Sequence, residues 1–317
     1  MKKTYLFIIL YTLCITGCTN DSRSVANTHN EHNFEQTVKI QDNHIEIPDS
    51  IQIKEWVTDG KDIMISTDNS DCLFALVSLD SLTISRTFGK KGRGAGEFLM
   101  PHILGGNGNG FTIIDNGTQK ILRLVGDSLL EVKEKSESDI FNQPHFIDSG
   151  IIGYEELSPR QLKLKRYSLS DGEISTILTF PENDVAENSD LFDFVWDAKD
   201  DNIVTAHLYT DRFSIRKIES DGIQSSVINV VGDEKFSQNR IVYSGISCGD
   251  FIYLLCQTNV DIEDFNGNSV IEKYDYNGNP VAKYVYEGIM DNIILDQEGN
   301  RIFFTSTSDE NIHYFEL

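Results

Sequence analysis

The sequence predicts an all-β fold, because one β-type pattern recurs along the chain and no segment after the N-terminal leader has the apolar spacing of a helix. The pattern is a polar turn rich in Gly, Asp or Asn, a β-type run, and a second run that ends in another polar turn. The first apolar residues of these runs are Ile63, Phe111, Ile151, Ile203, Phe251 and Ile302. Their spacing of 40 to 52 residues, about 48 on average, is typical of radially repeated β units.

A third run in the units alternates and then turns at Asp-Gly or Asn-Gly, as at Asp171-Gly172, Asp221-Gly222 and Asn277-Gly278. These pairs favour the positive φ angles of tight hairpins, so each unit is predicted to be an antiparallel meander. The sequence therefore predicts a six-bladed β-propeller of four-stranded antiparallel blades. Two stacked β-sandwiches are the alternative, but they would not produce six evenly spaced units.

The two ends of the chain predict how the ring closes. The sixth unit runs from Met290 to Leu317 and supplies only three strands. Spare strand-like residues lie before the first blade, at Thr37 to Gln41 or at His44 to Ile47. We expect one of these N-terminal strands to pair with the last blade and so to cover an otherwise open edge.

The N-terminus resembles the leader of a bacterial lipoprotein. Lys2 and Lys3 precede an apolar run from Tyr5 to Leu13, and the leader ends in Ile15-Thr16-Gly17-Cys18, which resembles a lipobox. This pattern predicts a signal peptide at 1–17, lipidation of Cys18 and attachment to the cell envelope, on the periplasmic face or the outer-membrane surface. An unmodified Cys beside an ordinary cleavage site is the alternative. The polar residues 18–36 are predicted to be a flexible tether, with the propeller at 37–317.

The net charge and the cysteine content limit which partners and which cysteine chemistry we expect. The chain has 27 Lys and Arg against 50 Asp and Glu, a formal net charge of −23, which repels phosphate backbones and predicts no nucleic-acid partner. Beyond the leader and Cys18, the cysteines are Cys72, Cys248 and Cys256. They are odd in number and lack metal-ligand spacing, so we expect three small buried thiols and no disulfide framework.

One segment carries a family resemblance. At the first blade boundary the chain reads Phe88-Gly-Lys-Lys-Gly92-Arg93-Gly94-Ala95-Gly96-Glu97-Phe98, followed by Pro101-His102. This resembles the G-x-x-G-x-G-P-G-E-F…P segment of the six-bladed, TolB-like propeller lipoproteins of Bacteroidetes, with Ala95 in place of the usual Pro. The resemblance implies an envelope lipoprotein with a propeller domain, in a family most of whose members have no established activity.

The same glycines could suggest a phosphate-binding loop. Such loops open a helix, whereas β-type runs lie on both sides of this segment. We therefore expect a long interblade turn whose glycines permit a tight backbone, with an ion pair between Arg93 and Glu97 across it.

Candidate ligand-binding residues are those predicted at the mouth of the central channel, where loops and innermost strands meet. They are His102, His145, Asp193, Ser244 and Asn292, with Asp291 as an alternative to Asn292. Two imidazoles and a carboxylate are suitable ligands for a divalent metal, so His102, His145 and Asp193 are the candidate metal site. Hydrogen bonding at the blade starts is the alternative role for the two histidines.

Other patterns have structural explanations as well as functional ones. The acidic stretch from Asp184 to Asp201 could bind calcium but also fits solvated turns, and the segment Asp261 to Asn268 lacks the register of a calcium loop. Trp56 and Trp196 could stack on sugars or fill the core. The exposed-turn triplets Asp49-Ser50-Ile51, Asp80-Ser81-Leu82 and Asp127-Ser128-Leu129 resemble an O-glycosylation sequence of Bacteroidetes envelope proteins.

These observations favour a lipid-anchored, non-catalytic binding module whose partner is a glycan, a peptide or an envelope protein. No catalytic motif such as Gly-x-Ser-x-Gly occurs. A channel-mouth lyase or hydrolase, with or without a divalent metal, is the alternative function. A purely structural component of an envelope complex is a third.

Overall fold

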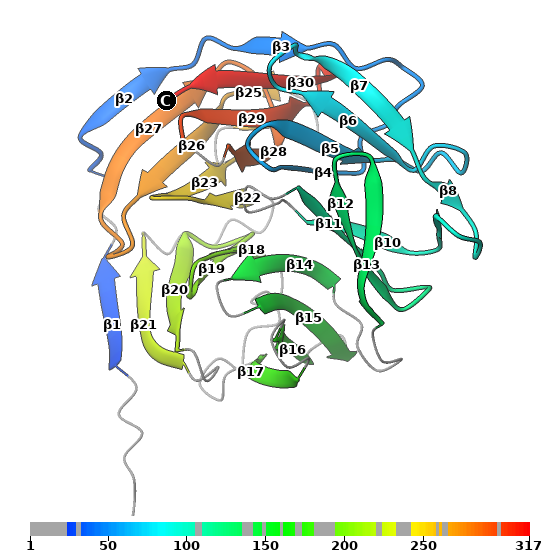
Figure 1. Cartoon of the computed structure of the whole chain (residues 1–317). Helices are drawn as coiled ribbons and strands as arrows, with labels where there is room; N and C mark the ends of the chain where they lie inside the picture. The colour runs from blue at the N-terminus through cyan, green and yellow to red at the C-terminus, as the bar shows by residue number, and fades with distance from the viewer. Residues whose placement is uncertain are drawn as a thin grey trace, which may run out of the picture.

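Six β-sheets are arranged around a central axis in the computed structural model of the chain (Figure 1). The structure describes residues 24–29, 33–104, 110–134, 142–147, 150–158, 161–168, 173–180, 194–219, 224–232, 242–257, 260–261, 266–296 and 299–317. Within these ranges the regular elements are all strands. None of them includes a helix long and apolar enough to cross a bilayer.

The first three sheets each contain four antiparallel strands in sequence order. Blade one has β4 (Glu55–Thr58), β5 (Asp62–Ser66), β6 (Phe74–Ser78) and β7 (Thr83–Phe88). Blade two has β10 (Pro101–Leu104), β11 (Phe111–Asp115), β12 (Lys120–Val125) and β13 (Ser128–Glu134). Blade three has β14 (Asn142–Ile147), β15 (Gly150–Ser158), β16 (Gln161–Tyr167) and β17 (Ile174–Phe180).

The last three blades repeat this meander and also take up strands from the N-terminal segment. Blade four has β18 (Phe194–Lys199), β19 (Asn202–His207), β20 (Arg212–Ile218) and β21 (Gln224–Val231). Blade five has β22 (Tyr243–Cys248), β23 (Ile252–Cys256), β26 (Ser269–Tyr274) and β27 (Pro280–Tyr286). Blade six has β28 (Met290–Leu295), β29 (Arg301–Ser306) and β30 (Asp309–Glu316). The six-bladed all-β fold is thus as predicted, and the stacked-sandwich alternative is wrong.

Two short strand pairs lie outside the blades. The strands β8 (Lys90–Lys91) and β9 (Glu97–Phe98) pair in parallel within the segment that joins blades one and two. The strands β24 (Val260–Asp261) and β25 (Asn266–Gly267) pair antiparallel between β23 and β26, so the sequence around Asp261 is an excursion between strands.

Both faces of the blades are buried, because hydrophobic clusters fill the contacts between neighbouring blades. In β5, Ile63 and Ile65 pack toward blade six, whereas Met64 packs toward blade two. The packing direction alternates from one residue to the next because successive strand residues point to opposite faces of a sheet. Corresponding clusters join blades two to three, three to four, four to five and five to six. This two-sided burial explains why strands such as β5, β11 and β23 are nearly continuous buried runs, whereas the outer strand β7 alternates.

The predicted turn chemistry is visible in the hairpin between β26 and β27. Gly278 has φ of 81° there, in the left-handed region that glycine tolerates. The Asp275 carboxylate accepts the backbone N–H groups of Asn277 and Asn279 at 2.9 and 2.8 Å. Burial alone would raise the pKa of Asp275, but the hydrogen bonds from Asn279 and Asn277 outweigh it and hold that pKa below its usual value.

The ring is closed by β3 (Asn43–Ile45), which pairs antiparallel with β30 as the outer strand of blade six. His44 lies opposite His313, and Ile45 lies opposite Ile312. The second of the two predicted positions, His44 to Ile47, is therefore the one that closes the ring. Ile45 and Ile47 are buried in the cluster between blades six and one, which supplies the apolar reason for this choice.

The other predicted closing segment, Thr37 to Gln41, pairs elsewhere. The strand β2 (Gln36–Lys39) runs parallel to β27 as a fifth strand of blade five, so its predicted pairing with the last blade is wrong. Ile40 directly after it is buried between blades five and six, and its N–H donates to the Val285 carbonyl at 2.8 Å. Ile40 thus finds an apolar site one blade before the ring closure.

The tether also differs from expectation. Residues Ser24–His29, inside the 18–36 segment predicted to be flexible, form β1, a parallel fifth strand on β21 of blade four. Because this pairing uses backbone groups, a polar segment with no apolar period can still join a sheet edge. The signal peptide and Cys18 lie outside the described residues.

His313 holds the closing segment in place through both of its ring nitrogens. Nδ1 lies 2.6 Å from the Asp42 carboxylate, which directly precedes β3, and Nε2 lies 3.0 Å from the Asp309 carboxylate. The ring also stacks on Phe304 at a centroid distance of 5.1 Å. The Ile47 N–H adds a bond to the Asn311 side chain at 3.1 Å. The short strand β3 is thus reinforced by side chains at both of its ends.

The ion pair with Asp309 gives the ring closure a pH dependence with a definite sign. Burial would raise the pKa of Asp309, but hydrogen bonds from His313 and Asn311 hold it below its ordinary value of 3.8. A depressed carboxyl pKa stabilises the fold above the unfolded-state pKa, and this stabilisation disappears as the pH falls through the folded-state value.

We therefore expect Asp309→Asn to lower the Tm by about 1 to 3 °C at pH 5.5, the scale of a partly exposed ion pair. At pH 3 the difference from wild type should shrink, because wild-type Asp309 is then becoming protonated. Thermal unfolding followed by circular dichroism at both pH values measures this. Asp49→Asn, an exposed change in the same N-terminal region, is the matched control. An Asp309→Asn deficit that grows at pH 3 would contradict the assignment.

Candidate functional site

The innermost strands of the six blades lie next to one another around the axis, in the order β4, β10, β14, β18, β22, β28 and back to β4 (Figure 1). The predicted channel residues fall on these strands. His102 is in β10, His145 in β14, Ser244 in β22 and Asn292 in β28. Asp193 lies outside the described residues.

His102 connects blade two to blade one. Its Nδ1 lies 2.9 Å from the Glu55 carboxylate of β4. The second oxygen of Glu55 accepts the Ile103 backbone N–H at 3.4 Å. The imidazole thus has the blade-start hydrogen bond that was the alternative to metal binding.

His145 begins a series of contacts that links blades three, four and five. Its Nδ1 lies 2.8 Å from Asp197 Oδ1 in β18, and its ring packs edge-on against Trp196 at a centroid distance of 4.3 Å. Asp197 Oδ2 accepts the Cys248 N–H of β22 at 2.7 Å. The next contact, from the Leu295 N–H to Ser247 Oγ at 2.9 Å, joins blade five to blade six. Polar side chains of the innermost strands therefore tie neighbouring blades together.

The two histidines bind carboxylates at different blade junctions. His102 pairs with Glu55 between blades two and one, and His145 pairs with Asp197 between blades three and four. No group of three His, Cys, Asp or Glu side chains among the described residues is arranged to hold a metal ion. The proposed triad with Asp193 stays a prediction.

The remaining predicted site residues have varied surroundings. The Ser244 hydroxyl is buried without a hydrogen-bond partner among the described residues, and the Asn292 side chain is exposed and accepts the Ile293 N–H. Trp56 and Trp196 are buried, which favours core packing over exposed stacking on sugars. The serines of the three Asp-Ser triplets, Ser50, Ser81 and Ser128, are exposed, and their glycosylation stays a hypothesis.

The three cysteines beyond residue 18 are free, as predicted. Cys256 is buried, whereas Cys72 and Cys248 are partly buried. Burial first, and then the neighbouring Asp197 carboxylate, raise the pKa of Cys248 well above its ordinary value. Cys248 is therefore a poor nucleophile.

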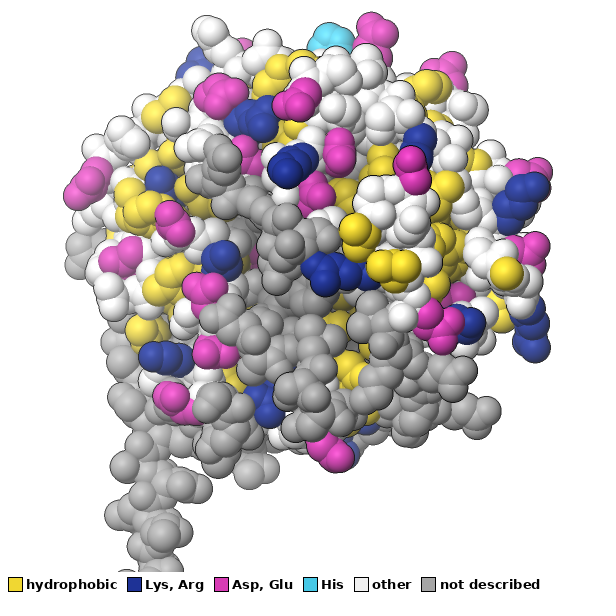
Figure 2. Space-filling model, in the orientation of Figure 1, with side chains coloured by type: hydrophobic (Ala, Val, Ile, Leu, Met, Phe, Trp, Pro, Cys, Tyr) yellow, Lys and Arg dark blue, Asp and Glu magenta, His cyan; other side chains and the backbone are white. Residues whose placement is uncertain are grey.

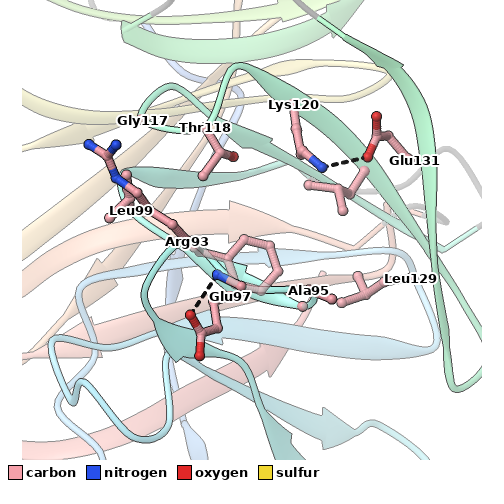
Figure 3. Close-up of a pocket in the computed structure, with 13 residues that line it drawn as sticks. Arg93, Ala95, Glu97, Leu99, Gly117, Thr118, Lys120, Leu129 and Glu131 are labelled. Atoms are coloured by element: carbon pink, nitrogen blue, oxygen red, sulfur yellow. Dashed lines mark hydrogen bonds and ion pairs between the residues drawn. The ribbon is translucent and has the colours of Figure 1, made fainter.

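A cavity of about 580 Å³ lies at the side of the ring, between the segment that joins blades one and two and the outer strands of blade two (Figure 3). Its near wall is formed by residues 93–99, and its far wall by residues of β12 and β13 with the β11–β12 turn. The volume is in the range of ligand pockets. This cavity uses the segment that carried the family resemblance.

Asp115 fixes the junction between the two walls. It is the last residue of β11, its side chain is fully buried, and its carboxylate accepts four hydrogen bonds. The donors are the backbone N–H groups of Leu99, Met100 and Gly117 and the hydroxyl of Thr118, at 2.9, 2.7, 3.0 and 2.7 Å. One buried carboxylate thus holds the end of the joining segment against the β11–β12 turn.

Glu97 shapes the near wall from within. Its carboxylate accepts the Gly94 N–H at 2.7 Å, and β9 pairs with β8 beneath it. A Cβ at Gly92 would lie 2.1 Å from Glu97 Oε2, so a larger residue there would have to displace the Glu97 carboxylate. The expected ion pair between Arg93 and Glu97 is absent, because the carboxylate binds backbone while the Arg93 side chain extends beside Leu99 and Gly117 (Figure 3). The prediction of an interblade turn between strands is confirmed.

The far wall combines an ion pair with an apolar surface. Lys120 Nζ lies 2.8 Å from Glu131 Oε2, and both side chains are about two-fifths exposed, at 42% and 40%. Leu122 and Leu129 line the same side and pack on the cluster between blades one and two. Phe98 is the one aromatic side chain of the lining, and it is only 1% exposed.

Sequence reasoning singled out the segment of the near wall but missed Asp115 and the residues of the far wall. Asp115 follows four buried apolar or Thr residues and precedes Asn116-Gly117, so a carboxylate at the entrance to a turn was a readable signal. Lys120 and Glu131 gave no sequence signal, because their proximity depends on the register between β12 and β13.

Comparisons with known proteins identify the fold. No protein-family model matches the sequence, and no curated protein matches it. Solved structures do match. A DUF4221 family member from Bacteroides vulgatus aligns with a TM-score of 0.60 at 10% identity, over 87% of this chain and 96% of that one. A Bacteroides fragilis protein described as exported aligns with a TM-score of 0.53 at 11% identity, over 92% and 98%. At these identities the likeness shows a shared propeller fold.

We predict that Asp115→Asn destabilises the chain and loosens the cavity wall. An amide has one accepting oxygen, so its NH₂ group would face N–H or O–H donors and leave buried donors unpaired. The expected loss in free energy of unfolding is about 2 to 3 kcal/mol. Chemical denaturation measures the loss, and hydrogen exchange should quicken at residues 97–100. Asp71→Asn, at an exposed position, is the control. Equal stability of the two variants would rule out this role for Asp115.

Proposed function

We propose that the chain is a lipid-anchored propeller of the bacterial cell envelope that binds a ligand without transforming it. The observation that carries the proposal is the cavity beside blade two. Its walls are held in place by the carboxylates of Asp115 and Glu97, which accept backbone N–H groups without any ligand. A preformed concave site with a few fixed polar groups is the usual form of a binding pocket. The ligand is a glycan, a peptide or a part of an envelope protein.

The channel supports a binding role more than a catalytic one. Four described titratable side chains of the innermost strands are paired between blades, Glu55 with His102 and His145 with Asp197. A catalytic acid or base needs a proton-transfer position facing a substrate. These groups instead face one another across blade junctions.

The envelope location is supported by the lipobox-like Ile15-Thr16-Gly17-Cys18 and by the structural similarity to a Bacteroides protein described as exported. A lipid at Cys18 would leave five residues between the anchor and the start of β1 at Ser24. The ring would then be held close to the membrane surface rather than on a long tether.

We expect Cys18→Ser, expressed in a bacterial host that processes lipoproteins, to move the protein from the detergent-rich phase to the aqueous phase in phase partitioning. Intact mass of the wild-type protein should show the acylated Cys18 as residue one. Cys72→Ser, which changes a thiol within the ring, should leave partitioning unchanged. An aqueous wild-type protein without added mass would overturn the anchor.

The binding proposal is tested by filling the cavity. Ala95 lines it and is exposed, so Ala95→Phe should occupy the space without disturbing the core. In a thermal-shift screen of short peptides, mono- and disaccharides and small carboxylic acids, we expect at least one class to stabilise the wild type by several degrees and the variant by less than one. Val38→Phe, at an exposed position of blade five, is the control. Equal shifts in all three proteins, or none, would refute the cavity as the binding site.

A further inference from the structure

We propose that the cavity binds the carboxyl end of a short peptide, with the terminal carboxylate on Arg93 and an aliphatic side chain over Leu122 and Leu129. This inference rests on the proposed function and specifies its ligand. It follows from the charge, the apolar surface and the two ends of the cavity.

The charged side chains of the lining are Arg93, Glu97, Lys120 and Glu131, and Arg93 is the cation without an ion pair among the described residues. Glu97 already accepts the Gly94 N–H, and Glu131 already pairs with Lys120. The Arg93 side chain is exposed and has no ion pair or hydrogen bond recorded within the described part of the chain. A guanidinium presents parallel N–H donors that match a carboxylate, so a carboxylate is the natural complement.

The joining segment is also a local concentration of positive charge. Acidic and basic side chains are interspersed over the described surface in Figure 2, on a chain whose net charge is −23. Lys90, Lys91 and Arg93 nevertheless fall within four residues. On a protein that repels anions generally, this is a place where an anionic group can approach.

The apolar part of the lining favours an aliphatic group over a sugar. Leu122 and Leu129 face the cavity beside Leu99, and the single lining aromatic, Phe98, is covered. Sugar rings are commonly held against exposed aromatic faces, which this lining does not offer within the described residues. A leucine-like side chain would instead bury apolar area against the two leucines.

The opposite end of the cavity favours a peptide over a simple fatty acid. In Figure 3, Arg93 and the Lys120–Glu131 pair lie on opposite sides of the cavity, with Leu129 below the pair. A carboxylate accepts several hydrogen bonds, so Glu131 can take a peptide amine while it keeps Lys120. A dipeptide carries an amine, an aliphatic centre and a carboxylate in that order, and a cavity of about 580 Å³ accommodates one.

Isothermal titration calorimetry with the dipeptide Leu-Leu tests the proposal. We expect Leu-Leu to bind wild type, and Arg93→Gln to weaken binding at least fivefold, the scale of one charge-assisted hydrogen bond. Lys90→Gln removes the same charge from the same segment but lies outside the cavity lining, so its affinity should change less than twofold. Leu-Leu amide, which lacks the carboxylate, should bind wild type as weakly as Leu-Leu binds Arg93→Gln.

Several outcomes would overturn the inference. If Leu-Leu and its amide bind equally, or if Arg93→Gln and Lys90→Gln lose the same affinity, Arg93 does not bind the carboxylate. If octanoate binds as tightly as Leu-Leu, the ligand class is a fatty acid and not a peptide. If Leu-Leu fails to bind while another screened class still depends on Ala95, the peptide inference fails and the binding function stands. If Leu-Leu binds Ala95→Phe unchanged, the cavity itself is excluded.

Discussion

Burial on both faces of every blade is the constraint on which the rest of this structure depends. A sheet whose two faces are both apolar is stable only between two other sheets, so the blades must form a ring without a first or last member. Interblade clusters among the described residues meet this need, and β3 completes the one between blades six and one by adding Ile45 beside Phe303 and Ile63. The short closing strand therefore matters more than its three residues suggest, and His313 with its two carboxylates strengthens it.

The acidic composition has a structural explanation at many positions. Asp59, Asp115, Asp275 and Asp296 each accept backbone N–H groups at a turn, with Asp296 also paired to Arg301. Carboxylates are strong acceptors for N–H groups that a tight turn leaves unpaired. A ring of short antiparallel strands has many such turns, so much of the negative charge follows from architecture rather than from a partner.

The sequence predicted the ring because its evidence is local and repeated. The apolar starts at Ile63 and Phe111, and the turn at Asn277-Gly278, follow from strand and hairpin chemistry that needs no knowledge of distant contacts. Where the N-terminal strands pair was harder, because β1 and β2 join their sheets through backbone groups and carry little apolar pattern. Both Thr37 to Gln41 and His44 to Ile47 looked suitable for closure, and only packing beside Ile312 separates them.

The candidate site shows the same limit. Local sequence indicates which residues begin a blade but not which residues of other blades they contact. His102 and His145 were identifiable as blade-start residues, but their partners Glu55 and Asp197 lie on neighbouring blades, which the local sequence does not indicate. The structure uses both imidazoles between blades, where a buried polar group with a fixed partner rigidifies a junction. The junction of blades one and two differs, because a long glycine-containing segment leaves a cavity beside the direct apolar contacts between these blades. The recognition surface that we propose lies at this cavity, on the side of the ring, where the Glu97 and Asp115 contacts fold the segment that carries Arg93.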